Sequence, residues 1–344
     1  MTDHDIQRAL VIGDGGWGTT LALLLARKGT PTVLWSAFPA QSDELRARRE
    51  NVRFLPGVPL PDTLEFSADE FAAAEGVDFV LSAVPTRYLR EVARRFEDAL
   101  KGNVPLVTAT KGLEIETFRT PSDILIEVLG ERPIAVLTGP SHAEEVARGL
   151  PASVVAASKN APLARRVQRA LSSDQFRVYT HDDPVGAEFA GALKNVIAIA
   201  AGICDGLGLG DNAKAALLTR GMAEMARFGV EHGAKYETFF GLAGIGDLVT
   251  TCCSRHSRNR AVGEAIGRGK SLREVLRGMQ MVAEGVYTAK ALFGPEVEFG
   301  ELRLPIAEQV HAILFEGKDP REAVLELMRR EPVSEVGGMA RGRA

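Results

Sequence analysis

The chain has 344 residues, of which 45% are hydrophobic and 25% charged, and its net charge at pH 7 is −4. This composition is typical of a globular protein with a sizeable core, and the length predicts two domains. The near-neutral charge excludes nucleic-acid binding through overall basic charge, although a local basic site stays possible.

Cysteine usage and the N-terminal residues indicate the compartment. Cys204, Cys252 and Cys253 are too few for a disulfide framework, and no zinc-type Cys/His spacing accompanies them. We therefore expect a reducing cytoplasm and no structural metal. Residues 1–13 carry early aspartates and only a short apolar run, so we expect no signal peptide. No apolar segment is expected to reach the roughly 18–20 residues that span a bilayer.

The first motif is a glycine-rich turn. An apolar run over 9–13 predicts a strand, G-D-G-G-W-G follows at 13–18, and a helical pattern comes next. Strand, GxGxxG and helix in this order are typical of a dinucleotide-binding fold. Gly13 would permit the tight turn, Gly15 the approach of a pyrophosphate, and Gly18 close packing of the helix on the strand. A glycine turn without a ligand is the alternative.

A second strand is expected over 32–35, and its end is unusual. NAD-binding sheets of this kind usually carry an Asp or Glu there for the ribose hydroxyls. Here S-A-F stands at 36–38, with no acid until Asp43 and no arginine until Arg46. The usual acid is absent and no clamp for a 2′-phosphate replaces it, so the choice between NAD and NADP stays open.

Strands then alternate with helices as far as residue 179. Apolar runs predict strands over 77–84, 105–109, 133–137, 153–157 and 175–179, and helical patterns lie at 87–100 and 162–171. This alternation predicts an α/β, Rossmann-like, doubly wound parallel sheet, with functional groups at the carboxyl ends of its strands. Lys111 and the 139–141 turn follow two of these strands. The alternatives are a surface-loop lysine at Lys111 and a helix N-cap at Ser141.

From residue 184 onwards the pattern is almost entirely helical, which predicts an all-α C-terminal domain. We expect 1–182 to form the dinucleotide-binding Rossmann domain and 183–344 the helical substrate and catalytic domain. A glycine-rich turn is expected at 205–210, and residues 337–344 are expected to be disordered.

A helix expected over 188–204 carries one unusual charge. Between residues 189 and 204 only Lys194 is charged, and Asn195 follows it. The 3.6-residue period places small or apolar side chains beside the lysine, and none can pair with an ammonium. Such a lysine extends to water, finds a partner from elsewhere, or loses its proton more easily than usual.

Two later stretches combine charge with glycine or amide residues. Asp247 follows three glycines within an apolar segment, where it caps a helix or supplies a carboxylate. S-R-N-R at 257–260 opens a helix that is expected to end near Gly267. Arginine, an amide and free N–H groups at a helix start form a phosphate site. A polar helix cap with solvated arginines is the alternative.

Together these motifs resemble bacterial NAD(P)-dependent glycerol-3-phosphate dehydrogenases over about residues 8–335. The matching motifs are G-x-G-x-W-G-T at 13–19, N-x-R-F-L-P-G at 51–57, A-T-K-G-L-E at 109–114, G-P-S-H-A-E-E-V at 139–146, A-L-K-N at 192–195, G-L-A-G-x-G-D-L at 241–248, S-R-N-R at 257–260, V-A-E-G at 282–285 and E-G-K-x-P-R-E-A at 316–323. The glycine fingerprint is shared by many unrelated dehydrogenases. The lysine–asparagine helix followed by G-D-L and S-R-N-R is far more specific.

The resemblance implies the reversible reduction of dihydroxyacetone phosphate to sn-glycerol 3-phosphate by NADH or NADPH. It further implies a cytoplasmic homodimer that serves glycerophospholipid synthesis, with no nucleic-acid partner and no membrane span.

The resemblance also implies the site. Lys194 matches the catalytic acid/base, and we expect Asp247 to be its partner. The expected substrate contacts are Lys111, Gly139, Ser141, Lys194, Asn195, Asp247, Ser257, Arg258 and Asn259. The expected cofactor contacts are Gly13, Gly15, Gly16, Trp17, Gly18, Ala37, Lys111, Ala143, Arg258, Val282 and Glu284.

The chain departs from the family pattern at two positions. Gly16 stands where many members have serine, which removes one side-chain contact to the diphosphate. Ser36-Ala37 stands where many carry a basic or polar residue, which leaves the adenine-ribose contact uncertain.

Two other classes of protein are the alternatives. A 6-phosphogluconate or 3-hydroxyacid type of dehydrogenase also joins a Rossmann domain to a helical one, but S-R-N-R beside G-D-L favours a small phosphorylated triose. A nicotinamide-sensing regulator would not need Lys194, and no basic recognition helix is visible in the sequence.

Overall fold

The computed structural model describes residues 6–279, 281–297, 302–332 and 334–335. The chain divides into two compact units. The N-terminal unit holds 1–111 and 119–188, and the helical unit holds 112–118 and 189–344. The backbone therefore passes from one unit to the other three times. The tail 337–344, which we expected to be disordered, lies outside the described residues.

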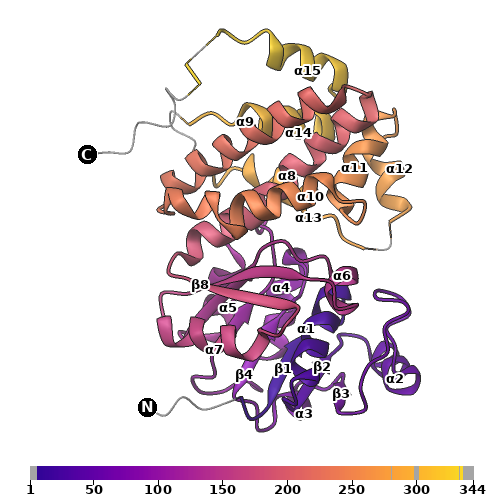
Figure 1. Ribbon diagram of the computed structural model, residues 1–344, viewed down its shortest axis with the longest axis vertical. Coiled ribbons are helices and arrows are strands. Elements are labelled where there is room, and N and C mark those ends of the chain that lie inside the picture. The colour runs from indigo at the N-terminus through magenta and orange to yellow at the C-terminus, as the bar shows by residue number, and fades with distance from the viewer. Residues whose placement is uncertain (1–5, 280, 298–301, 333, 336–344) are drawn as a thin grey trace. The chain divides into compact units, whose positions relative to one another are not determined.

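The N-terminal unit is built on one eight-stranded sheet with the order β3-β2-β1-β4-β5-β6-β7-β8. Figure 1 labels β1 to β4 and β8 of this sheet. The strands are β1 Ala9–Ile12, β2 Thr32–Trp35, β3 Leu64–Ser67, β4 Phe79–Ser82, β5 Leu106–Thr108, β6 Ile134–Thr138, β7 Ala152–Ala157 and β8 Phe176–His181. The strand order reverses between β1 and β4. Sheets of this kind bind ligands at that switch point, beyond the carboxyl ends of the strands.

Helices cover both faces of this sheet. They are α1 Gly16–Arg27, α2 Pro39–Arg48, α3 Glu70–Ala74, α4 Thr86–Arg95, α5 Pro121–Leu129, α6 Ala143–Ala147 and α7 Ala161–Leu171. Val11 belongs to the apolar cluster under α1, α6 and α7, whereas its neighbour Leu10 belongs to the cluster under α3, α4 and α5. Alternate residues of a strand point to opposite faces, so β1 is buried on both. The expected doubly wound architecture is confirmed.

Two details of the sheet differ from expectation. We missed β3, an edge strand of four residues whose Glu65 is exposed, because its apolar signal is too short to recognise. β7 pairs antiparallel with β6, although we expected a wholly parallel sheet. The connection between them contains only the five-residue helix α6. A parallel crossover usually contains a helix that runs back along the sheet, and α6 is too short for that.

The helical unit contains no strand among its described residues, so the all-α expectation is confirmed. Its elements are α8 Pro184–Leu207, α9 Gly210–Glu231, the 3-10 helix η1 Tyr236–Phe240, the π-helix η2 Leu242–Gly246, α10 Asp247–Cys253, α11 Arg258–Gly267, α12 Leu272–Arg277, α13 Glu284–Leu292, α14 Pro305–Phe315 and α15 Pro320–Met328. α8 begins in the N-terminal unit and enters the helical unit at Phe189. The turn expected at 205–210 is shorter than predicted, because α8 continues to Leu207.

α8 corrects our expectation about membrane-spanning segments. With 24 residues it is long and apolar enough to cross a bilayer by length and composition, so the statement that no segment qualifies was wrong. Its most apolar window of 18 residues is 100% buried within the protein. A core helix passes the same test, and this burial accounts for the apolar sequence.

Close backbone contact joins α11 to α8 within the helical unit. A Cβ atom at Gly263 would lie 1.9 Å from the carbonyl oxygen of Ile199, and one at Gly202 would lie 2.0 Å from that of Arg260. Real Cβ atoms do not approach so closely, so each helix needs glycine where it meets the other. The contact fixes the position of α11 relative to the helix that carries Lys194.

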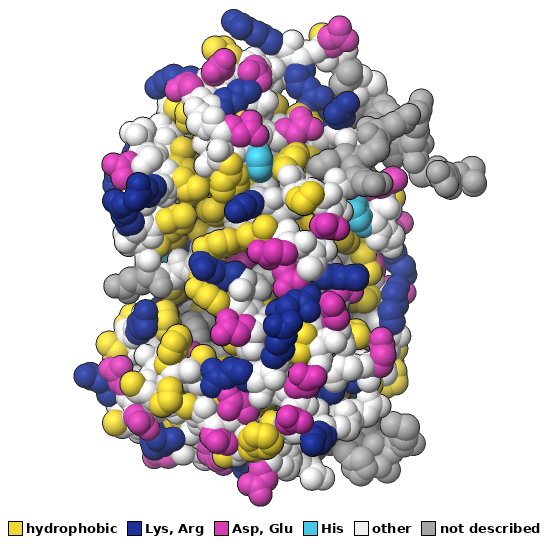
Figure 2. Space-filling model, turned by 180° about the vertical axis from the view of Figure 1, so that it is seen from behind, with side chains coloured by type: hydrophobic (Ala, Val, Ile, Leu, Met, Phe, Trp, Pro, Cys, Tyr) yellow, Lys and Arg dark blue, Asp and Glu magenta, His cyan; other side chains and the backbone are white. Residues whose placement is uncertain are grey.

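The surface carries charge of both signs. Figure 2 shows acidic and basic side chains interspersed over the face that it presents, with apolar side chains between them. This mixture agrees with the net charge of −4. On that face no large region of one sign stands out that would attract a polyanion.

Two buried glutamates hold helix N-termini. Glu188 accepts hydrogen bonds from the N–H (2.8 Å) and Oγ (2.6 Å) of Ser122, at the start of α5. Glu224 on α9 accepts from the N–H groups of Ile306 (2.8 Å) and Ala307 (3.3 Å), at the start of α14. Burial raises the pKa of each carboxyl to about 7, against the opposing effect of these hydrogen bonds.

Glu224 should make the stability of the protein depend on pH. Its pKa is about 7 in the folded protein against an ordinary 4.5, so the folded state holds the proton more tightly. The contribution of Glu224 to the free energy of unfolding is present in full below pH 4.5. It is lost as the pH rises through 7, at up to about 1.4 kcal/mol per pH unit. We therefore expect the free energy of unfolding, measured with urea at several pH values, to fall less with rising pH in Glu224→Gln than in the wild type.

The exposed Glu97 provides the control for this measurement. Glu97→Gln should leave the pH dependence unchanged. Identical pH dependence in the wild type and in Glu224→Gln would contradict the prediction.

Candidate active site

Glycines shape the turn between β1 and α1. Gly13 has a φ of +107°, and a Cβ atom at Gly18 would lie 1.8 Å from the carbonyl oxygen of Gly13. Both positions therefore require glycine. Apart from Gly15 and its two chain neighbours, no atom of the described residues lies within 4 Å of the place that a Cβ at Gly15 would occupy, so a ligand can approach this backbone closely. The first N–H groups of α1 have no partner within the helix, which suits an anionic group.

Asn51 holds this turn in place. Its Nδ2 donates to the carbonyl oxygen of Asp14 at 2.7 Å and to Oγ1 of Thr19 at 2.8 Å. Its Oδ1 accepts from the N–H of Phe54 at 3.1 Å. The N-x-R-F-L-P-G motif therefore supports the glycine turn by fixing its backbone.

Other expected cofactor residues lie beside the turn. A Cβ at Gly16 would be 2.8 Å from the carbonyl oxygen of Phe54, so serine could not replace this glycine without a shift of the backbone. The same Cβ would be 3.6 Å from that of Ala143 on α6, which places Ala143 at the turn. Trp17 is half-buried, and its Nε1 has no hydrogen-bond partner among the described residues. Ala37 lies beyond β2, where its carbonyl accepts from Arg95 at 3.4 Å.

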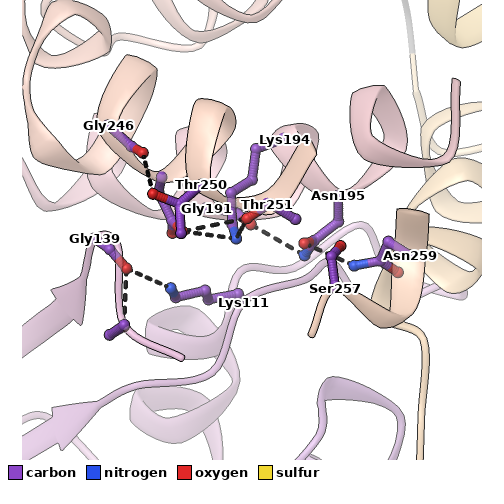
Figure 3. A network of polar contacts seen from close by, with 12 residues as sticks. Lys111, Gly139, Gly191, Lys194, Asn195, Gly246, Thr250, Thr251, Ser257 and Asn259 are labelled. Atoms are coloured by element: carbon purple, nitrogen blue, oxygen red, sulfur yellow. Dashed lines mark hydrogen bonds and ion pairs between the residues drawn. The ribbon is translucent and has the colours of Figure 1, made fainter. Parts of the chain in front are cut away.

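Lys111 and Ser141 meet at one carbonyl group in the N-terminal unit. The Nζ of Lys111 donates to the carbonyl oxygen of Gly139 at 3.1 Å (Figure 3). Oγ of Ser141 donates to the same oxygen at 2.8 Å. Ser141 does not cap α6, whose N-cap is His142, so that alternative was wrong. Lys111 is half-buried, so it is not the solvated loop lysine of the other alternative.

Lys194 forms a buried ion pair in the helical unit. Its Nζ lies 2.9 Å from Oδ1 of Asp247. The same Nζ lies 2.5 Å from Oγ1 of Thr251, a contact that can be followed in Figure 3. Lys194 is 5% exposed and Asp247 2%. The lysine therefore does not extend to water. Its partner Asp247 lies on α10, 53 residues further along the chain.

Asp247 reaches this position because the π-helix η2 leads directly into α10. Asp247 is the first residue of α10, whose N-cap is Gly246, so the helix-cap alternative for this aspartate was wrong. Burial alone favours loss of the proton from a lysine, whereas a carboxylate at hydrogen-bond distance favours the ammonium. The pairing makes a buried charge tolerable on an apolar helix.

Thr251 is the neighbour of Lys194 that the sequence did not predict. It lies four residues after Asp247 on α10 and is 4% exposed, and its Oγ1 donates to Asp247 at 3.4 Å. Residues at this spacing share one helix face. The signal was therefore present in D-L-V-T-T, but a threonine at such a spacing is too common to stand out.

A chain of amide hydrogen bonds joins three helices of the unit. Nδ2 of Asn259 donates to Oδ1 of Asn195 at 2.9 Å, and Oδ1 of Asn259 accepts from the N–H of Gly285 at 2.9 Å (Figure 3 shows the first of these). The Asn259 side chain thus links α11 to both α8 and α13. Its partner Gly285 directly follows Glu284 in the chain. Val282 lies just before α13 and is half-buried. Because the side chain is engaged, the N–H of Asn259 in the first turn of α11 remains the group suited to an anion.

The two arginines of S-R-N-R differ in their surroundings. Nε of Arg260 donates to Asp205 at 2.6 Å, and the same carboxylate is 2.8 Å from Lys214. Arg258 is exposed. Ser257 is the N-cap of α11 and accepts from the N–H of Arg260 at 3.2 Å. The polar-cap interpretation is therefore right for Ser257, whereas solvated arginine does not describe Arg260.

A doubly wound sheet with a glycine turn, followed by an all-α unit with a buried lysine, defines a two-domain dinucleotide-dependent dehydrogenase. Residues 8–164 match the model of the N-terminus of NAD-dependent glycerol-3-phosphate dehydrogenase, and residues 183–325 match that of its C-terminus. The chain belongs to the NAD-dependent glycerol-3-phosphate dehydrogenase family.

Individual relatives agree with this family. The chain is 51% identical over 330 residues to a glycerol-3-phosphate dehydrogenase [NAD(P)+] of Chlorobium limicola, covering 95% of this chain and 98% of the relative. A crystal structure of the Coxiella burnetii glycerol-3-phosphate dehydrogenase is 41% identical, with a TM-score of 0.90 over 94% of this chain and 99% of that one. The Saccharomyces cerevisiae enzyme is 26% identical, with a TM-score of 0.79 over 94% and 99% of the two chains.

The buried ion pair should be important for stability. Asp247→Ala is expected to lower the free energy of unfolding by about 3–5 kcal/mol, because it leaves a buried ammonium without a counter-charge. The apolar double variant Lys194→Met, Asp247→Leu should recover most of this loss. Urea unfolding followed by circular dichroism measures both.

The exposed pair of Arg46 and Asp43 provides the control. Asp43→Ala should cost less than about 1 kcal/mol, as surface ion pairs do. If the free energy of unfolding lost in the double variant equalled the sum of the losses in the two single variants, Lys194 and Asp247 would not be coupled.

Proposed function

We propose that this protein catalyses the reversible reduction of dihydroxyacetone phosphate to sn-glycerol 3-phosphate with NADH or NADPH. The observation that carries the proposal is the buried lysine on α8, with Asp247 and Thr251 at its Nζ. Relatives named glycerol-3-phosphate dehydrogenase [NAD(P)+], about half identical over nearly the whole chain, support it.

The residues of the N-terminal unit fit a dinucleotide. The cradle at Gly15 is open, and the first turn of α1 offers backbone N–H groups to a diphosphate. When bound, the nicotinamide supplies the hydride for a ketone. In this proposal Gly13, Gly15, Gly16, Trp17, Gly18 and Ala143 hold the cofactor at the turn, and Ala37, Lys111, Arg258, Val282 and Glu284 complete its contacts.

Lys194 supplies the proton. Its ammonium polarises the substrate carbonyl as negative charge builds on the oxygen, and then donates the proton to the alkoxide. Asp247 and Thr251 hold Nζ in one place, so the proton donor is oriented before the substrate arrives. In the oxidative direction Lys194, once deprotonated, accepts the proton from the alcohol.

The start of α11 holds the substrate phosphate in this proposal. The Arg258 guanidinium and the N–H groups of the first turn are suited to a phosphate. Anchoring a group remote from the reacting carbon lowers the entropic barrier to alignment. Lys111, Gly139 and Ser141, and with them Asn195 and Ser257, are proposed as further substrate contacts.

We assign cofactor binding to 1–182 and substrate binding with catalysis to 183–344. A cytoplasmic homodimer that serves glycerophospholipid synthesis is the setting that we propose. A kinetic comparison of dihydroxyacetone phosphate with unphosphorylated dihydroxyacetone tests the activity directly. Equal turnover of the two ketones would count against the phosphate site and against the proposed substrate.

Lys194→Ala should lower turnover by roughly 10²–10⁴-fold, the usual contribution of a general acid. NADH binding, measured by titration calorimetry, should remain, because the lysine lies outside the glycine turn. Lys194→Arg keeps the charge with a different geometry and should also lose most of the turnover. Unchanged turnover in Lys194→Ala would overturn the catalytic role.

Arg258→Ala should chiefly raise the KM for dihydroxyacetone phosphate, because the guanidinium binds the phosphate and not the reacting carbonyl. Arg255→Ala, at a nearby exposed arginine, is the control and should leave the KM unchanged. The prediction fails if Arg258→Ala has wild-type kinetics with the phosphorylated substrate.

A further inference from the structure

A carboxylate of the glycine turn reaches the end of β2. Ser36 follows β2 directly and is fully buried, and its Oγ donates to Oδ2 of Asp14 at 2.8 Å. Asp14 stands 22 residues earlier in the chain, between Gly13 and Gly15. An acidic group therefore lies where a sheet of this kind carries its ribose-binding acid, although no acid follows β2 in the sequence.

Asp14 is held firmly in this position. Its side chain accepts from Ser36, and its carbonyl oxygen accepts from Nδ2 of Asn51 at 2.7 Å and from Oγ1 of Thr19 at 3.2 Å. The residue is only 9% exposed. Burial raises the pKa of the carboxyl, and the hydrogen bond from Ser36 acts in the opposite direction. Hydrogen bonds to both its backbone and its side chain thus hold the Asp14 carboxylate beside Ser36.

The charges around the end of β2 do not neutralise this carboxylate. Arg46 and Arg95 pair with acids of α2 and α3, respectively. Asp14 makes no ion pair with any residue in the described ranges. The positive charge that acts on Asp14 is that of Arg53, which is exposed and stacked on the ring of Phe54.

We propose that Asp14, positioned by Ser36, makes this protein select dinucleotides with a free 2′-hydroxyl, so that it binds NADH in preference to NADPH. The proposal rests on the proposed function, since it concerns the adenine ribose of the same cofactor. A ribose hydroxyl donates a hydrogen bond to a carboxylate, whereas a 2′-phosphate brings like charge to it. Salt screens a partly buried charge less than an exposed one, so the repulsion persists at physiological ionic strength.

Titration calorimetry with NADH and with NADPH tests the proposal on the full-length protein. The wild type should bind NADH at least about 10-fold more tightly, and Asp14→Asn should reduce that ratio about 10-fold, mainly by tightening NADPH binding. Asparagine keeps an acceptor for Ser36, so the turn should stay folded. Asp98→Asn removes one negative charge from an exposed position of the same unit and should leave the ratio unchanged.

Three results would overturn the proposal. One is equal affinity of the wild type for the two cofactors, and another is an unchanged ratio in Asp14→Asn while both cofactors bind. The third is a wild type that prefers NADPH together with an Arg53→Ala variant that selectively loses NADPH binding. In that case Arg53 would be a clamp for the 2′-phosphate. A wild-type protein that bound neither cofactor would contradict the proposed function itself.

Discussion

The ion pair between Lys194 and Asp247 is the constraint around which the helical unit is organised. An ammonium on an almost wholly apolar helix is unfavourable unless a carboxylate meets it at hydrogen-bond distance. That carboxylate has to come from far along the chain, so α10 must begin beside the middle of α8. The π-helix η2 starts α10 at Asp247, and Thr251 then falls on the same face one turn later. The position of the Lys194 ammonium and the packing of α8 against α10 therefore depend on the same contacts.

Two of the three positions where the chain passes between the units are held by local contacts on each side. In the helical unit, Phe118 packs its ring against Phe189 with centroids 6.3 Å apart, in spite of a φ of +57°. In the N-terminal unit, the carboxylate of Glu188 binds Ser122. Two passages that lie about 70 residues apart in the sequence are thus secured within both units. Glu188 is buried for this structural reason, and its raised pKa needs no catalytic role.

Local patterns explain what the sequence could predict. The glycine turn, the β2 strand at 32–35, the helix after S-R-N-R and the isolated charge of Lys194 each depend on neighbours within a few residues. The antiparallel β7, the bond from Asp14 to Ser36 and the Lys194–Thr251 contact depend on residues brought together by the fold, the last of them 57 positions apart. Spacing cannot show such pairs. The sequence identified an unusual lysine and the resemblance pointed to Asp247 as its partner, but only the three-dimensional arrangement identified Thr251 beside both.

The S-R-N-R motif shows how one short sequence divides between structure and chemistry. Ser257 caps α11, the Asn259 side chain joins three helices, and Arg260 is held by Asp205. These three side chains fix where the helix begins, and the glycine contact at Gly263 fixes its distance from α8. What the motif presents to a ligand is then the exposed Arg258 and the N–H groups of the first turn. A phosphate needs a rigid set of donors more than it needs many side chains, because donors that are already ordered lose little entropy on binding. Most of the motif therefore serves to hold the few groups that would touch the substrate.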